Sequence, residues 1–413
     1  MSVDLMVLRA LHRRPIKKRL YAMIALEFLF GIVYGIFSLT LPILADTIIS
    51  NLALLGIIFA LPEIIGTVVD IPIGSFAKRF GRRRTIFYSG MLLGLSSLFF
   101  MITKNPFLFV AILIFYEVAT QSFIIPGDAE ETALTPARTT GKFNALLEGF
   151  HNLGFSLGPI LAGAVIGYYF NSAFWIALLV SLAMITLSII YLPREEEHEK
   201  FQTALEHVIT RDKLLKAGFS EFRTLGFEGF FVAFIFFSFA LHWGFIALME
   251  PLYTQEIGLS EWQTGLIYAG FTIPIFFVSL FIERYIDRRG TKLVTVAGLF
   301  LHALAAFGFS FTTDPLLLFV FSLVSGVGDG LILPAIFTMF DHLSSYHHKE
   351  HVSGIKMFGE SLGYFAGPLL AGVLAAFVGY PGTFLSLGIF LVILTTITMV
   401  VPLRVAEIRI SVL

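Results

Sequence analysis

Ionisable side chains occur inside the long apolar stretches of this sequence, where they are costly to keep. The candidates for chemistry are Glu27, Glu63, Glu117, His151, His242, Asp329 and Glu360. Apart from Lys356, these stretches hold no lysine or arginine. A carboxyl group without a cationic partner in such a setting exchanges protons near neutral pH and can also hold a cation. The pattern therefore predicts proton exchange or cation binding. It argues against a multiply charged anionic substrate, which arginine or lysine would normally bind.

These candidates lie in twelve apolar stretches of about 20 residues, the length needed to cross a bilayer. We place the stretches at 21–44, 52–76, 85–103, 107–128, 144–169, 173–192, 226–252, 262–283, 293–312, 316–339, 353–378 and 383–403. Charged residues make up only 14% of the chain and mean hydropathy is +0.85, whereas soluble proteins average about 25% charged residues. We therefore expect an all-α membrane protein with twelve transmembrane helices. The sequence contains no cysteine, which excludes disulfides, thiolate metal sites and cysteine nucleophiles.

The two halves of the chain are related copies. Gly154, Gly158, Pro159 and Gly163 recur 209 residues later as Gly363, Gly367, Pro368 and Gly372, and the same shift relates Pro42 to Pro251, Gly35 to Gly244 and Gly81 to Gly290. Parallel repeats of this kind are typical of membrane transporters. We expect two pseudo-symmetric six-helix halves at 1–193 and 223–413. The segment between them, 194–222, has apolar residues at near-helical spacing and is predicted to form an amphipathic linker helix.

Lysine and arginine are segregated along the chain. All but Lys104 of the 28 lie in the termini, in the central segment, or in alternate loops between the apolar stretches and at their edges, where Lys356 begins the eleventh. Because basic residues accumulate on the cytoplasmic side of membrane proteins, we expect both termini and the linker to be cytoplasmic. This arrangement requires an even number of spans and predicts a multi-pass protein of the plasma (inner) membrane.

Two loops of the repeat resemble motif A of the major facilitator superfamily, a Gly-x-x-x-Asp-Arg-x-Gly-Arg-Arg pattern. The matching residues are Gly74, Arg79, Gly81, Arg82 and Arg83 after the second stretch, and Asp287, Arg288 and Gly290 after the eighth. The resemblance extends over the whole chain in span number, duplication and orientation. In the family this loop latches the two halves together. Lys78 replaces the usual aspartate of the first copy, and Asp70 is expected to supply the missing negative charge.

The repeated glycine–proline pattern beginning at Gly154 resembles the family's motif C, which is enriched among antiporters. Small residues at this spacing also let helices approach closely, so helix packing alone is an alternative interpretation. The resemblance implies that spans 1, 4, 7 and 10 line a central cavity. The cavity would include Glu27, Tyr34, Glu117, Gln121, His242, Trp243 and Asp329, with Tyr34 and Trp243 equivalent across the repeat. His302, in the ninth span, is expected to belong to the scaffold.

A histidine-rich loop precedes the eleventh span and contains Asp341, His342, His347, His348 and His351. Histidines at such spacing can bind a divalent metal, but we interpret this segment as a solvated loop and assign no metal site. The soluble segments contain no phosphate-binding loop, zinc-protease helix or nucleophile elbow, so we do not expect an ATP-driven pump. We expect no enzyme activity and no cofactor.

Together these features predict a secondary active transporter that exports amphipathic or cationic compounds in exchange for protons. It would be similar to multidrug and tetracycline-type antiporters, although the fourth span lacks the arginine of many proton-driven members. The alternatives are a symporter or uniporter for sugar-like nutrients, a non-transporting receptor, a lipid scramblase and a divalent-metal transporter using Asp329 and the histidines. The expected partners are a small-molecule substrate, protons and the lipid bilayer. We expect a monomer with no nucleic-acid partner.

Overall fold

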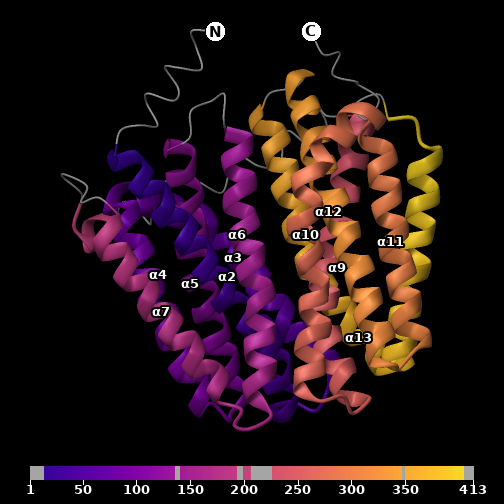
Figure 1. The fold of residues 1–413 in the computed structure, drawn as a ribbon, viewed down its shortest axis with the longest axis horizontal. Coiled ribbons are helices and arrows are strands. Elements are labelled where there is room, and N and C mark those ends of the chain that lie inside the picture. The colour runs from indigo at the N-terminus through magenta and orange to yellow at the C-terminus, as the bar shows by residue number, and fades with distance from the viewer. Residues whose placement is uncertain (1–13, 135–139, 193–198, 206–225, 347–348, 404–413) are drawn as a thin grey trace. The chain divides into compact units, whose positions relative to one another are not determined.

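The computed structural model of the chain describes residues 14–134, 140–192, 199–205, 226–346 and 349–403 (Figure 1). The described part is helical and contains no strand. The first half of the chain forms α2 (Arg14–Ile48), α3 (Leu52–Phe80), α4 (Arg82–Ile102), α5 (Pro106–Leu134), α6 (Thr140–Ile166) and α7 (Ser172–Tyr191). The second half forms α9 (Gly226–Glu256), α10 (Glu261–Arg289), α11 (Thr291–Phe311), α12 (Pro315–Tyr346) and α13 (Lys349–Val400).

Twelve membrane-spanning segments follow from these helices. Within the described residues, 10 helices are long and apolar enough to cross a membrane. One of them, α13, is 52 residues long and contains two spans, because the backbone leaves the helical conformation at Gly379 (φ 68°, ψ 175°). The remaining span is α10, whose 29 residues cover the predicted eighth stretch. The predicted all-α architecture is confirmed.

The helix starts repeat from one half to the other. Gly81 and Gly290 precede α4 and α11 and both have positive φ angles, 110° and 83°, which favour glycine. At another pair of equivalent positions, Asn105 Oδ1 accepts a hydrogen bond from the first turn of α5, and Asp314 Oδ1 accepts one from the first turn of α12. Side-chain caps of this kind satisfy backbone groups that a helix end leaves unpaired. The duplication seen in the sequence therefore extends to the backbone conformation.

Backbone contacts divide the chain into two compact units. Unit 1 comprises Met1–Phe37 and Ile65–Leu214, and unit 2 comprises Ser38–Ile64 and Leu215–Leu413. The last turns of α2 and the first turns of α3 thus belong to unit 2. Each unit is considered separately below. The boundaries predicted at 193 and 223 concern the sequence repeat and stay a prediction.

Glycines allow neighbouring helices to approach very closely within each unit. In unit 1, a Cβ added to Gly158 of α6 would lie 2.6 Å from the backbone oxygen of Ile32 in α2. In unit 2, a Cβ added to Gly367 of α13 would lie 2.5 Å from the backbone oxygen of Leu241 in α9. Any larger side chain would force the backbones apart, as at the small-residue contacts typical of membrane helices. The two glycines are equivalent in the repeat, so both units use the same device.

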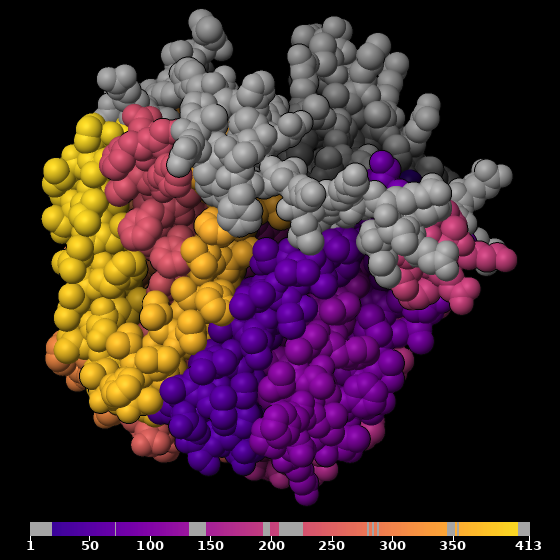
Figure 2. Space-filling view, turned by 180° about the vertical axis from the view of Figure 1, so that it is seen from behind, coloured from indigo at the N-terminus to yellow at the C-terminus, as the bar shows by residue number. Residues whose placement is uncertain are grey.

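The outer surface of unit 2 is apolar. Along the last segment of α13, coloured yellow in Figure 2, the exposed side chains include Ile389, Ile393 and Ile397. Water would solvate such a surface poorly, but lipid chains suit it. The surface is that of a helix facing the hydrocarbon core of a bilayer.

Residues 199–205 of the predicted linker are described. Residues 201–205 are helical, and Phe201 packs edge-on against Phe76 and Phe80 of α3. The remaining residues of the predicted amphipathic helix, from 206 to 222, lie outside the described part of the chain. The described residues of the linker therefore pack against α3 through Phe201.

Candidate functional site

A buried carboxylate occupies the middle of α5. Glu117 is 9% exposed, and its Oε1 accepts a hydrogen bond from Gln121 Nε2 at 2.8 Å, one helical turn further along. A Cβ added to Gly66 of α3 would lie 2.8 Å from the same oxygen, so the backbone of α3 passes directly beside the carboxylate. Asp70, one turn from Gly66, lies close enough to Glu117 for the two acids to interact electrostatically. Within the described residues, Glu117 has no lysine or arginine partner.

A second acid of unit 1 faces a histidine. Glu27 of α2 is 9% exposed, and its Oε2 lies 3.1 Å from His151 Nδ1 of α6. The ring of Tyr34 lies 6.5 Å from that of His151 and stacks on Phe30 at 5.9 Å. A further acid, Glu131, lies close enough to Glu27, Asp128 and Glu148 to interact with each of them electrostatically. This part of unit 1 therefore combines aromatic rings with concentrated negative charge.

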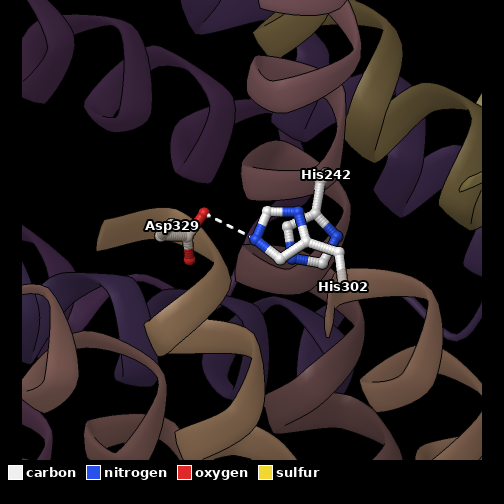
Figure 3. A group of neighbouring side chains, drawn as sticks. All are labelled: His242, His302 and Asp329. Carbon is white, nitrogen blue, oxygen red and sulfur yellow. Dashed lines mark ion pairs between the residues drawn. The ribbon is translucent and has the colours of Figure 1, made fainter. Parts of the chain in front are cut away.

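The third group lies in unit 2, where His242 of α9, His302 of α11 and Asp329 of α12 meet (Figure 3). The two imidazole rings are stacked, with centroids 4.0 Å apart and an interplanar angle of 13°. Asp329 Oδ1 lies 3.1 Å from His302 Nε2 and accepts a hydrogen bond from Trp243 Nε1 at 3.1 Å. All three side chains are at most 1% exposed, whereas Trp243 is only partly buried.

Glycines permit this convergence. A Cβ added to Gly328, the residue before Asp329, would lie 2.5 Å from His302 Cδ2 and 2.8 Å from its Nε2. The same helices also touch where Gly298 of α11 faces the side chain of Ile332. Small residues thus bring α11 and α12 close enough for the histidine and the aspartate to meet.

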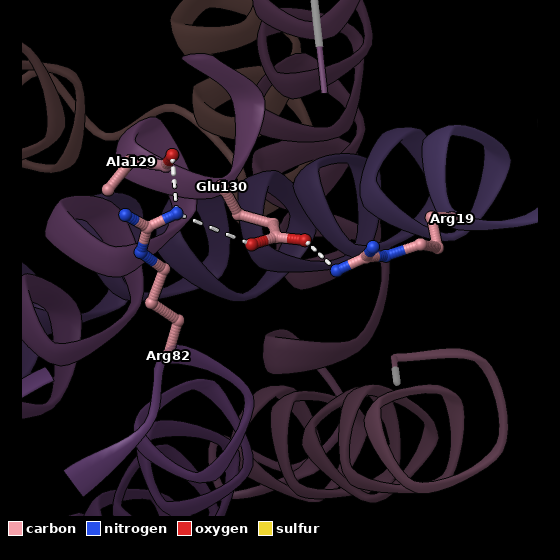
Figure 4. A network of polar contacts seen from close by, with 4 residues as sticks. All are labelled: Arg19, Arg82, Ala129 and Glu130. Carbon is pink, nitrogen blue, oxygen red and sulfur yellow. Dashed lines mark hydrogen bonds and ion pairs between the residues drawn. The ribbon is translucent and has the colours of Figure 1, made fainter. Parts of the chain in front are cut away.

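The arginines of the first motif A loop bind an acid and helix ends. Glu130 of α5 lies between Arg19 Nη2, at 2.8 Å, and Arg82 Nη1, at 3.6 Å (Figure 4). Arg82 also donates to the backbone oxygen of Ala129 at 2.9 Å, and Arg83 donates to carbonyls at the end of α7. Arg79 pairs more loosely with Glu199, at 3.5 Å. The acid that pairs with Arg82 is therefore Glu130, whereas Asp70 interacts electrostatically with Glu117.

Some predicted site residues lie apart from these groups. Glu63 and Glu360 are partly buried on α3 and α13, both within unit 2. The side chains of Asp287 and Arg288 in the second motif A copy are outside the described part of the structure, although Gly290 is within it. The same holds for His347, His348 and the side chain of His351 in the histidine-rich loop.

Sequence reasoning missed two residues, His302 and Glu130. The sequence predicts a scaffold role for His302, and the structure places it in a stack on His242 beside Asp329. Its spacing from those residues carries no signal, because the three belong to different helices. The only usable signal is that a histidine inside an apolar stretch needs polar partners. Glu130 follows the fourth apolar stretch and could have been matched with the arginines of the adjacent loop.

Comparison with known proteins identifies the family to which the chain belongs. The sequence profile of the Major Facilitator Superfamily matches residues 23–246 and 231–409. The chain is 25% identical over 132 residues to quinolone resistance protein NorA of Staphylococcus aureus (strain Mu50 / ATCC 700699), and 26% identical over 132 residues to Multidrug resistance protein 1 of Bacillus subtilis (strain 168). Each match covers 32% of this chain and 34% of the relative, so it spans about a third of the length of those curated proteins.

Solved structures of the same fold cover nearly the whole chain. The human organic anion transporter MFSD10 (TETRAN) superposes with a TM-score of 0.63 at 16% identity, covering 94% of this chain and 100% of the other. For the nucleoside transporter NupG the TM-score is 0.68 at 13% identity, and the match covers 92% of this chain and 98% of the other. A bacterial homologue of the human lysosomal transporter Spinster, in an inward-facing conformation, superposes with a TM-score of 0.70 at 15% identity. The match covers 94% of this chain and 96% of the other. At these identities the likeness shows the fold alone. With the profile match across both halves, it follows that the chain belongs to the Major Facilitator Superfamily and is a multi-pass membrane transporter, not an enzyme.

Proposed function

We propose that this transporter exports small amphipathic or cationic compounds by alternating access, in exchange for protons. Protons and substrate would bind in turn to acids buried within the helices, and the opening of one side of the membrane would alternate with that of the other. The protein would act as a monomer in the plasma (inner) membrane, with both termini cytoplasmic.

The observation that carries the proposal is the environment of Glu117. Its Oε1 accepts a hydrogen bond from the neutral amide of Gln121, and the charged residue close enough to act on it electrostatically is another acid, Asp70. A carboxylate at mid-membrane without a permanent cation is stabilised by a proton or by a cationic ligand. The two occupants would compete for the same oxygens. Competition of this kind couples the release of one to the binding of the other.

The composition of unit 1 supports an amphipathic or cationic substrate. The Glu27–His151 pair lies next to the rings of Tyr34 and Phe30, and a further acid, Glu131, lies close enough to Glu27 to interact with it electrostatically. Aromatic faces bind both apolar surfaces and cations, and acids favour cations over anions. The partial similarity to two proteins named for quinolone and multidrug resistance points in the same direction.

Proton flux in proteoliposomes tests the proposal. The purified protein is reconstituted with an imposed pH gradient and a luminal pH dye, and lipophilic cations, a quinolone, a nucleoside, an organic anion and a sugar are added in turn. We expect cations or amphipathic drugs to dissipate the gradient in the wild type, and we expect Glu117→Gln to abolish this flux. Glu261→Gln, at a partly buried position in the first turn of α10, is the matched control and should retain it.

Two outcomes would contradict the proposal. If no compound produces coupled proton flux in the wild type, the export is not proton-driven. If Glu117→Gln transports as well as Glu261→Gln, Glu117 has no part in the mechanism. Both variants replace a carboxylate by its isosteric amide, so a general loss of negative charge cannot produce the expected difference.

A further inference from the structure

We propose that His242, His302 and Asp329 form a binding site in unit 2 for one divalent transition-metal ion of the zinc class. The three residues come from α9, α11 and α12. One potential ligand atom from each lies within 4.8 Å of those of the other two. Two imidazoles and a carboxylate are a common ligand set for zinc and other first-row transition metals. The inference does not depend on the direction of transport or on proton coupling.

Polar atoms without partners support the site. Among the described residues, Asp329 Oδ2 and the Nδ1 atoms of both histidines make no hydrogen bond, although all three side chains are almost fully buried. His302 Nε2 approaches Asp329 Oδ1 to 3.1 Å without the direction of a hydrogen bond, so this nitrogen remains available to a third group, whereas Oδ1 already accepts from Trp243 Nε1. Buried polar atoms are expensive to leave unpaired. Their convergence indicates a ligand that binds several of them at once.

A metal ion accounts for these atoms better than a shared proton. One proton joins one donor to one acceptor, so it would leave the other buried nitrogens and oxygens unpaired. Both rings cannot be protonated together, because their centroids are only 4.0 Å apart and like charges at that distance repel strongly. A divalent cation would bind the carboxylate and, once the stacked rings turn toward it, a lone pair of each ring, and Asp329 would neutralise one of its two charges.

The surroundings resemble the second shell of a metal site. His242 Nε2 lies 3.0 Å from Ser325 Oγ. If that nitrogen carries the proton and donates it to the hydroxyl, the free lone pair of the ring is on Nδ1, the atom without a partner. Ligating histidines characteristically use their second nitrogen in this way. Trp243 Nε1 donates a hydrogen bond to Asp329 Oδ1. The ring of Phe239 lies beside His302, and the ring of Phe271 lies beside His242.

The test measures metal binding by the full-length protein in detergent, purified with a tag that contains no histidine. The protein tested, called the background protein, carries four substitutions that remove the competing histidines of the loop before the eleventh span: His342→Gln, His347→Gln, His348→Gln and His351→Gln. Zn²⁺ is titrated calorimetrically, and Co²⁺ is followed by its visible absorption, which reports coordination geometry. We expect one ion bound per chain in this background.

Variants of the cluster then identify the ligands. Replacing a second-shell partner typically weakens a metal site ~10–100-fold, so we expect His302→Gln and Asp329→Asn each to weaken binding by at least ~100-fold and Ser325→Ala by ~10-fold. Glu250→Gln is the matched control. It removes another buried carboxylate of unit 2, which accepts from Ser322 Oγ at 3.3 Å, and it should bind Zn²⁺ normally.

Three results would overturn the assignment. The assignment is wrong if the background protein binds neither ion, or if His302→Gln and Asp329→Asn bind Zn²⁺ as tightly as the background protein. If those variants fail to fold, X-ray absorption of the zinc-loaded background protein decides between the alternatives. Two imidazole ligands with a carboxylate oxygen would support the site, and fewer than two imidazoles would contradict it.

Discussion

Gly158→Ala is a direct test of the close contact between α2 and α6. The added Cβ would lie 2.6 Å from both Ile32 O and Ile36 N, about 0.8 Å inside the 3.4 Å at which ordinary van der Waals contact begins. Both atoms belong to the backbone of α2, so no side-chain rotation can relieve the overlap and the helices must separate. Overpacking of this kind costs ~1–3 kcal/mol. We expect the free energy of unfolding to fall by that amount relative to a matched alanine variant.

The matched variant is Gly74→Ala in α3, where the nearest atom to the added Cβ is Ile125 Cγ2 at 3.5 Å. Both substitutions gain the same intrinsic helix propensity, ~1 kcal/mol, so this contribution cancels in the comparison. The assay is equilibrium unfolding of the purified protein in mixed micelles of a mild detergent and SDS. Gly367→Ala, whose Cβ would lie 2.5 Å from Leu241 O, should behave like Gly158→Ala. Equal stability of Gly158→Ala and Gly74→Ala would refute the geometry described for α2 and α6.

Three further predictions follow from particular contacts. Glu130→Gln should destabilise the protein by ~1 kcal/mol more than Glu199→Gln in the same unfolding assay, because the Glu130 side chain is buried between two arginines while the longer Glu199 pair is only partly buried. Equal effects would contradict this. Gly379→Ala should cost ~1–3 kcal/mol, since φ 68° and ψ 175° lie in a region nearly exclusive to glycine, and an unchanged stability would argue against the break between the two spans of α13. In this cysteine-free chain, Lys104→Cys should react with a membrane-impermeant maleimide added outside intact cells and Lys200→Cys only after lysis; the reverse labelling would invert the proposed topology.

Much of the fold could be predicted because a bilayer imposes simple rules. Length and hydropathy located the spans, and the glycine–proline repeat revealed the duplication. Gly81 and Gly290 marked loops whose positive φ the structure then showed. The assignment of residues 38–64 to unit 2 was not predictable, because it depends on which helices pack together and not on any local pattern.

The candidate site was less accessible to sequence reasoning. Glu27 and His151 were both named, but nothing in their spacing shows that they face each other at 3.1 Å across α2 and α6. The scaffold assignment of His302 rested on analogy between spans, and the glycines at 298 and 328 that bring it to Asp329 act only in three dimensions. Sequence therefore identifies which polar groups are buried, and packing decides which of them meet.

The most direct test of proton-coupled export is the substrate gradient that proteoliposomes maintain at equilibrium under a fixed pH gradient, with the membrane potential clamped at zero. The substrate is a labelled compound that elicits proton flux. If each substrate molecule exchanges for one proton, its concentration ratio should reach roughly tenfold per pH unit, because one unit corresponds to about 1.36 kcal/mol. Glu117→Gln should reach a ratio of one, since it has lost the proton site. A ratio of one in the wild type at every pH gradient would contradict the account and identify the protein as a carrier that only equilibrates its substrate.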